Sequence, residues 1–167
     1  MPIRLIVFFW LLLGATVSAK TLCSPSEKVL FSCPIKNSAK IASVCASPHI
    51  DRDQGYLQYR FGAPGKLELV YPQTRAGSQK QFYWREFRPY QSSLRTLTFK
   101  SGSYSYTLSA YDVSETLNNI KGGAQFGELE TENTRSNSKA TVLRCAAFPE
   151  GEFNLGGIVE DADKLGK

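Results

Sequence analysis

Short runs in which apolar and polar positions alternate recur along most of this chain, and they are rich in β-branched and aromatic residues. Glycine, proline, asparagine and serine separate the runs, which is typical of β-strands joined by tight turns. The pattern predicts nine strands, at residues 28–33, 40–46, 56–61, 66–71, 81–87, 94–100, 103–111, 125–131 and 139–146. We therefore expect an all-β fold, an antiparallel β-sandwich or barrel of eight or nine short strands.

The alternation is clearest in residues 103–111. Tyr104, Tyr106, Leu108 and Ala110 fall on one side of an extended chain, and serine and threonine residues occupy the positions between them. This predicts a half-buried strand with a hydroxyl-lined outer face. Residues 113–120 contain the one weak helical candidate, which is too short to change the fold class.

Residues 1–19 have the parts of a secretory signal peptide: a positive charge, an apolar run at 5–13 and small residues at 17–19. The run is too short to cross a hydrocarbon core of about 30 Å, which needs about 20 helical residues. Leucine stands directly before Cys23, where lipoprotein processing requires a small residue. We expect a cleaved leader, a periplasmic or secreted chain that begins near Lys20, and no transmembrane segment after cleavage.

The charge of the chain is modestly positive, with 20 Lys and Arg residues against 15 Asp and Glu residues. This excess permits contact with anionic membrane headgroups or acidic glycans but requires neither, and export makes nucleic acid an unexpected partner. Residues 75–100 are rich in arginine and lysine, whereas residues 150–167 carry five acids and two lysines. We expect one β-rich domain at 20–149 followed by an acidic, loosely ordered tail at 150–167.

Four cysteines follow the leader: Cys23, Cys33, Cys45 and Cys145. An even number in an exported chain indicates two disulfides, for which three pairings are open. Cys33 and Cys45 lie symmetrically about a polar turn at 36–40, so we expect them to face each other in a hairpin. Cys23 would then pair with Cys145. The cysteine spacings fit no zinc pattern, and no metal or cofactor is expected.

Catalytic devices find little support in the sequence. His49 is the single histidine, and any Ser–His or Cys–His pair would depend on it. Asp51 and Asp53 follow it in a polar loop, where carboxylates are usually only solvated. We expect a protein that is not an enzyme; a small hydrolase with an unrecognised carboxylate site and a purely structural envelope protein are the minor alternatives.

An aromatic and basic segment surrounds Trp84. One interpretation is a core strand with Phe82 and Trp84 inward. The other is a ligand face, formed by Tyr83, Arg85 and Arg88, on which sugars could stack.

The segment Lys100-Ser101-Gly102-Ser103-Tyr104 predicts a tight hairpin, in which Ser101-Gly102 links two strands and Gly102 supplies a positive φ. Its tip exposes small hydroxyl groups with Lys100 beside them. A narrow, rigid tip of this kind can enter the cleft of another protein and hydrogen-bond a pair of catalytic carboxylates.

The motif Ser101-Gly102-Ser103-Tyr104, in an exported β-rich domain, resembles the S-G-x-Y loop of the bacterial periplasmic lysozyme inhibitors, most closely the invertebrate-type inhibitors. The resemblance implies that the loop inserts into a lysozyme cleft, that Ser101 reaches the catalytic acids and that Tyr104 braces the loop. Residues 56–72 are also similar to uncharacterised exported proteins of Gram-negative bacteria. We expect a secreted, non-catalytic binding protein whose partner is a lysozyme or, as the alternative, a cell-envelope glycan. The oligomeric state stays open.

Overall fold

The structure, a computed structural model, describes residues 20–114, 124–136 and 138–162. In these residues the chain forms ten strands and one short 3-10 helix, η1. They are β1 (Lys28–Pro34), β2 (Ile41–Ala46), β3 (Leu57–Ala63), β4 (Lys66–Tyr71), η1 (Ser78–Gln81), β5 (Tyr83–Phe87), β6 (Ser92–Ser101), β7 (Tyr104–Val113), β8 (Ala124–Asn133), β9 (Thr141–Arg144) and β10 (Glu160–Asp161). The predicted strands correspond to β1 through β9, so the all-β fold class is confirmed. The predicted signal peptide and most of the weak helical candidate lie outside the described residues.

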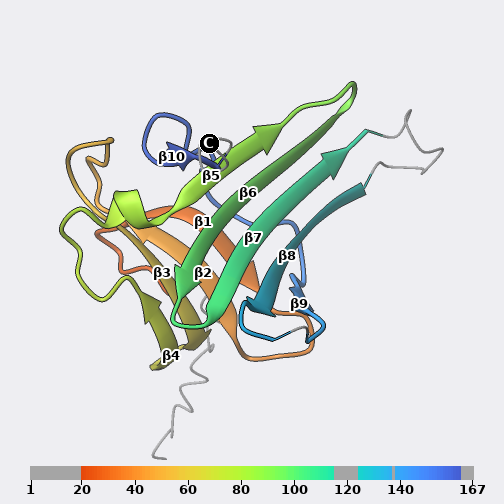
Figure 1. The fold of residues 1–167 in the computed structure, drawn as a ribbon, viewed down its shortest axis with the longest axis horizontal. Coiled ribbons are helices and arrows are strands. Elements are labelled where there is room, and N and C mark those ends of the chain that lie inside the picture. Colours follow the sequence, from red (N-terminus) through yellow and green to blue (C-terminus); the bar gives the residue numbers. More distant parts are fainter. Residues whose placement is uncertain (1–19, 115–123, 137, 163–167) are drawn as a thin grey trace, which may run out of the picture.

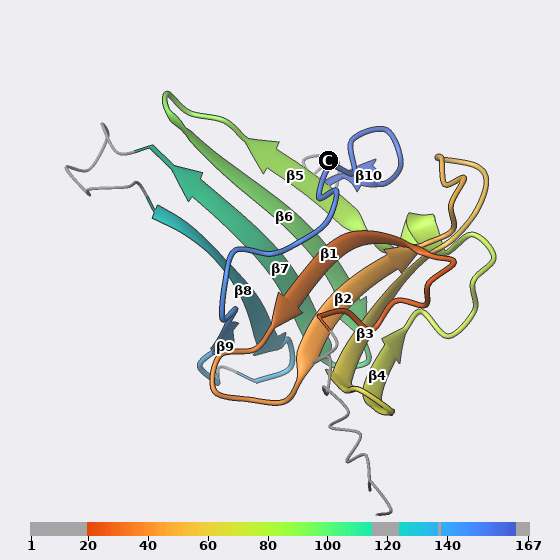
Figure 2. The ribbon, with the colours of Figure 1, turned by 180° about the vertical axis from the view of Figure 1, so that it is seen from behind.

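Two sheets face each other. The smaller has the order β1-β2-β3-β4, and the larger has the order β10-β5-β6-β7-β8-β9. Figures 1 and 2 show the smaller sheet crossing one end of the larger, while the long strands β5 to β8 continue past it. The result is a sandwich whose second layer covers only part of the first.

Aromatic side chains fill the space between the sheets. Phe99 of β6 is fully buried, and its ring stacks on Tyr71 at 4.6 Å and on Tyr106 at 4.9 Å between ring centroids. Tyr59 and Phe82 contact the same ring at 4.9 and 5.4 Å. Contacts of this kind each add about 0.5–1.5 kcal/mol beyond the area that they bury. The core therefore sits where the two sheets overlap.

The inner face of the large sheet changes character along its strands. Leu97 and Leu108, which lie under the small sheet, are fully buried. On the same face, Arg95 stands two residues before Leu97 in β6, and Asp112 stands four residues after Leu108 in β7. Glu86 of β5 lies opposite Arg95. The polar residues mark the end of the sheet that the second layer leaves uncovered.

The disulfides join Cys23 to Cys45 and Cys33 to Cys145, so the predicted pairing is wrong. The register of β1 and β2 sets Cys33 opposite Ala42, not opposite Cys45. Cys45 is three positions beyond Ala42, an odd offset that turns its side chain to the other face of the sheet. Cys33 therefore reaches the segment after β9, and Cys45 reaches the N-terminal segment. Two disulfides indicate an oxidising environment outside the cytosol.

The C-terminal segment contributes buried side chains to the core. The acidic composition predicted a loosely ordered tail, but residues 150–162 pack against both sheets. The amide of Ser32 donates to the carbonyl of Glu150 at 2.7 Å, and the reverse bond is 3.0 Å. Phe153 is 6% exposed and lies 4.7 Å from Phe31 and 5.0 Å from Trp84 between ring centroids. Its buried side chains, rather than its charges, decide how this segment is held.

Candidate functional site

The predicted hairpin is present at the junction of β6 and β7. Ser101 pairs with Tyr104, so the two-residue loop is Gly102–Ser103 and not Ser101–Gly102 as predicted. Gly102 has a φ of 59° and Ser103 has no positive φ, the pattern of a type II′ turn, which matches the natural twist of a hairpin. A Cβ atom on Gly102 would meet nothing within 4 Å, so glycine is needed here for the backbone angle alone.

A neighbouring connection braces the turn. The carbonyl of Ser103 accepts hydrogen bonds from both the amide and the hydroxyl of Thr134, at 2.8 and 3.1 Å. Tyr104 is 45% exposed, and its ring lies 6.5 Å from Tyr106, which in turn stacks on the buried Phe99. A chain of aromatic rings thus runs from the base of the hairpin into the core.

The surface of the hairpin is polar. Lys100 and Gly102 are exposed, and Ser101 and Ser103 are half-buried. Among the described residues, Lys100 forms no salt bridge, so its ammonium group can meet an acidic partner. The hairpin therefore presents a cation and two hydroxyl groups on a fixed backbone.

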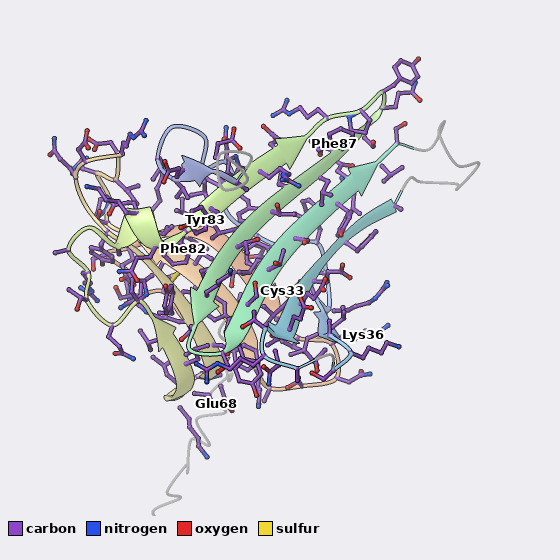
Figure 3. The ribbon with its side chains drawn as sticks, in the orientation of Figure 1. Cys33, Lys36, Glu68, Phe82, Tyr83 and Phe87 are labelled. Carbon is purple, nitrogen blue, oxygen red and sulfur yellow. A yellow bond between two sulfur atoms is a disulfide. The ribbon has the colours of Figure 1, made fainter. Side chains whose placement is uncertain are left out.

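The second predicted surface is divided between two faces. This surface was predicted around β5, where Figure 3 labels Phe82, Tyr83 and Phe87. Phe82 and Trp84 are buried, as the core-strand interpretation expects, and Tyr83 and Arg85 share the outer face. The guanidinium of Arg88 instead binds Glu86 at 2.7 Å, and Glu86 belongs to the inner face.

Glu86 is held by two arginines at once, because Arg95 donates to the same carboxylate oxygen at 2.8 Å. The hydrogen bond from Arg88, with that from Arg95, lowers the pKa of Glu86. Tyr83, Arg85 and Arg88 therefore do not form one continuous ligand face.

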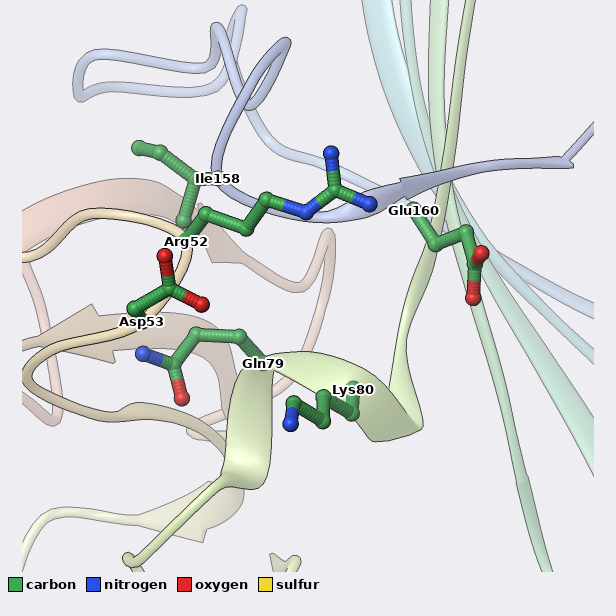
Figure 4. Close-up of a pocket in the computed structure, with 6 residues that line it drawn as sticks. All are labelled: Arg52, Asp53, Gln79, Lys80, Ile158 and Glu160. Atoms are coloured by element: carbon green, nitrogen blue, oxygen red, sulfur yellow. The ribbon is translucent and has the colours of Figure 1, made fainter.

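A cavity of about 300 Å³ lies between a loop, η1 and the C-terminal segment (Figure 4). Its lining carries two cations, two carboxylates, an amide and one apolar side chain: Arg52, Asp53, Gln79, Lys80, Ile158 and Glu160. Sequence reasoning missed it because these residues come from three segments far apart in the chain. The one available signal was the small set of apolar residues, at 153, 155, 158 and 159, among the acids of the last segment.

The loop at this cavity has a structural explanation. The carboxylate of Asp51 accepts hydrogen bonds from the amides of Asp53 and Gln54 at 2.8 and 2.7 Å. Gln79 donates to the carbonyls of Asp51 and Gln54 at 3.1 and 2.8 Å, which fixes the loop to η1. His49 is exposed in the same loop, and no nucleophile pairs with it in the described residues. The hydrogen bonds of Asp51 and Gln79 fold the loop upon itself and hold it against η1.

Across the residues that the structure describes, no group of three or more His, Cys, Asp or Glu side chains is placed to hold a metal ion. Within the same residues no helix is long and apolar enough to span a membrane. Comparison with known proteins found no matching family model, curated protein or solved structure. The Ser101–Tyr104 hairpin is the candidate site that both the motif and the geometry select.

Proposed function

We propose that this protein is an exported, non-catalytic binding protein, similar to lysozyme inhibitors, that inserts its Ser101–Tyr104 hairpin into a glycosidase cleft. The observation that supports this most directly is the type II′ turn at Gly102, in which the carbonyl of Ser103 accepts two hydrogen bonds from Thr134. A loop that is already ordered loses little conformational entropy when it docks.

The chemistry of the hairpin suits a cleft lined by carboxylates. The hydroxyl of Ser101 can donate to a carboxylate oxygen, and the exposed ammonium of Lys100 adds an opposite charge beside it. Hydrogen bonds to charged groups are shorter and stronger than those between neutral groups. Lys100 and Ser101 are neighbours at the end of β6, so their side chains leave opposite faces of the sheet and flank the turn from both sides.

Export to the periplasm or the exterior supports the same proposal. The disulfides need an oxidising environment, and the first nineteen residues have the composition of a cleaved signal peptide. Cell-wall hydrolases act in that environment, so the proposed partner and the protein would meet there.

The test is inhibition of chicken-type, goose-type and invertebrate-type lysozymes on one cell-wall substrate at two salt concentrations. We expect near-stoichiometric inhibition of one class. Ser101→Ala should weaken it at least about tenfold, because one hydrogen bond to a carboxylate is lost. Gly102→Val should abolish it, because a β-branched residue does not accept a φ of 59°.

Gly65→Val is the matched control. Gly65 has a φ of 77° in the turn between β3 and β4, and a Cβ there also meets open space. The two glycine variants carry similar backbone strain, so only the hairpin variant should lose inhibition. Equal inhibition by the unaltered protein, Ser101→Ala and Gly102→Val would contradict the proposal, as would silence against all three lysozymes.

A glycan-binding face on the outer surface of the large sheet is the second candidate. Tyr83 and Arg85 stand beside Thr98 and Thr96, so aromatic, cationic and hydroxyl groups share one face. Arg88 is not part of it, because Glu86 holds that side chain on the other side. Binding to a glycan array, together with no effect on any lysozyme, would favour this candidate.

A further inference from the structure

The hairpin between β5 and β6 stands clear of the small sheet. Both ribbon views place its tip at the end of the large sheet that the second layer does not cover (Figures 1 and 2). Phe87 is 60% exposed and Tyr90 is 78% exposed, the two highest values among the exposed large apolar side chains of the described residues. Large apolar groups held in water on a projecting element mark a contact surface.

This aromatic tip has a fixed backbone. The amide of Ser92 donates to the carbonyl of Pro89 at 3.2 Å, and the amide of Ser114 donates to the carbonyl of Gln91 at 2.9 Å. Gln91 adopts a φ of 55°, which closes the turn. The exposed rings therefore extend from an ordered turn, so little order has to be gained when they bind.

Charge differs between two pairs of neighbouring strands in the large sheet, β5–β6 and β7–β8. On the part of the β5–β6 hairpin that leads to the tip stand three cations and one carboxylate: Arg85, Arg88, Arg95 and Glu86. Lys100 lies at the other end of β6. Strands β7 and β8 carry four carboxylates and no cation: Asp112, Glu128, Glu130 and Glu132. At the edge of the sheet, β10 adds Glu160 and Asp161 beside β5. Among these strands, the excess of cations is therefore confined to the β5–β6 hairpin, which carries the aromatic tip.

We propose that the tip at Phe87–Tyr90 docks the protein on an anionic lipid surface. Aromatic rings at a membrane interface bury their apolar parts, and arginines beside them meet the lipid headgroups. The tip projects beyond the small sheet (Figures 1 and 2), so it can meet a broad surface without contact from that sheet. The excess of cations in its hairpin favours a negatively charged surface. This proposal does not rest on lysozyme inhibition, because the Ser101–Tyr104 hairpin lies at the other end of β6.

The test is sedimentation of the oxidised protein, purified after export and with its N-terminus determined by mass spectrometry. The vesicles contain either equal parts of phosphatidylglycerol and phosphatidylcholine or phosphatidylcholine alone. We expect binding to the anionic vesicles that weakens with salt. The double variant Phe87→Ser/Tyr90→Ser should bind at least about tenfold more weakly, and Arg88→Gln about fivefold more weakly.

Leu67→Ser/Val142→Ser is the matched control, since Leu67 and Val142 are 48% and 47% exposed on β4 and β9, away from the tip. It should bind as the unaltered protein does. A second readout is Tyr90→Trp, whose added fluorescence should shift to the blue on anionic vesicles. Absence of vesicle binding, equal losses in the tip and control pairs, or an unshifted Tyr90→Trp emission would each overturn the proposal. Binding to a protein in place of lipid would appear as the first of these outcomes.

Discussion

Glu27 shows how one side chain can anchor the N-terminal segment. Its side chain is 2% exposed, and both carboxylate oxygens bind the guanidinium of Arg60, at 2.6 and 2.7 Å. The hydroxyl of Tyr56 and the amide of Ser24 donate to it as well, each at 2.7 Å. Burial alone would raise the pKa of Glu27, but the hydrogen bonds from Arg60, Tyr56 and Ser24 outweigh it and lower the pKa to about 2.

This cluster predicts acid sensitivity. Because the pKa of Glu27 is lower in the folded protein than its ordinary 4.5, its stabilisation is present above pH 4.5 and is lost as pH falls towards 2. A depression of that size corresponds to about 3 kcal/mol. Urea denaturation should show Glu27→Gln less stable by about that amount at pH 6 and by progressively less as the pH falls from 5 to 2. Glu68→Gln, which removes an exposed partner of Lys40, should cost less than about 1 kcal/mol. A Glu27→Gln deficit that stays constant with pH would contradict this assignment.

At the scale of elements, the positions of the strands were predictable from the sequence. The contacts that join residues of different elements were not. Alternation located β4 at its observed bounds, and β5 begins later than predicted only because residues 78–81 form η1. The predicted disulfide pairing was wrong because the pairing depends on the β1–β2 register. The symmetric placement of two cysteines about a turn does not determine that register. The hairpin tip was predictable from Gly102, whereas its brace from Thr134 joins residues distant in the sequence. The side chain of Arg88 is held by its salt bridge to Glu86, and the alternation along the strand did not predict that salt bridge.

The packing of the C-terminal segment was not predicted because its few apolar residues are spread among acids. One of those apolar residues gives a test of how firmly the segment belongs to the core. Phe153 fills the space between Phe31 and Trp84. Phe153→Ala should lower the free energy of unfolding by about 3–5 kcal/mol, because it leaves a cavity in the core. Phe87→Ala, at an exposed position, should change it by less than about 0.5 kcal/mol. Equal effects of the two variants in urea denaturation would show that the C-terminal segment is not part of the core.

The whole molecule is an incomplete sandwich, and this shape places its two candidate surfaces at opposite ends of the long strands. One end is covered by the small sheet and holds the hairpin at Gly102, while the other end lies beyond the small sheet and carries Phe87 and Tyr90. Strand β6 has ten residues, and at about 3.3 Å per residue its ends are separated by about 30 Å. A partner at one end therefore leaves the other end open.

Because the small sheet covers only one end of the long strands, we predict that backbone amides along a single strand differ in their protection from hydrogen exchange. Both halves of β6 pair with β7 over their whole length, so their backbone hydrogen bonds are equivalent. Leu97 and Phe99 lie against the second layer, whereas Ser93 and Arg95 on the same face do not. Local opening should therefore be easier at the uncovered end. Hydrogen exchange should be at least about tenfold faster for the amides of residues 92–94 and 111–113 than for those of 97–99 and 106–108. Uniform protection along β6 and β7 would mean that the second layer does not govern their stability, and that the aromatic tip is held as firmly as the core.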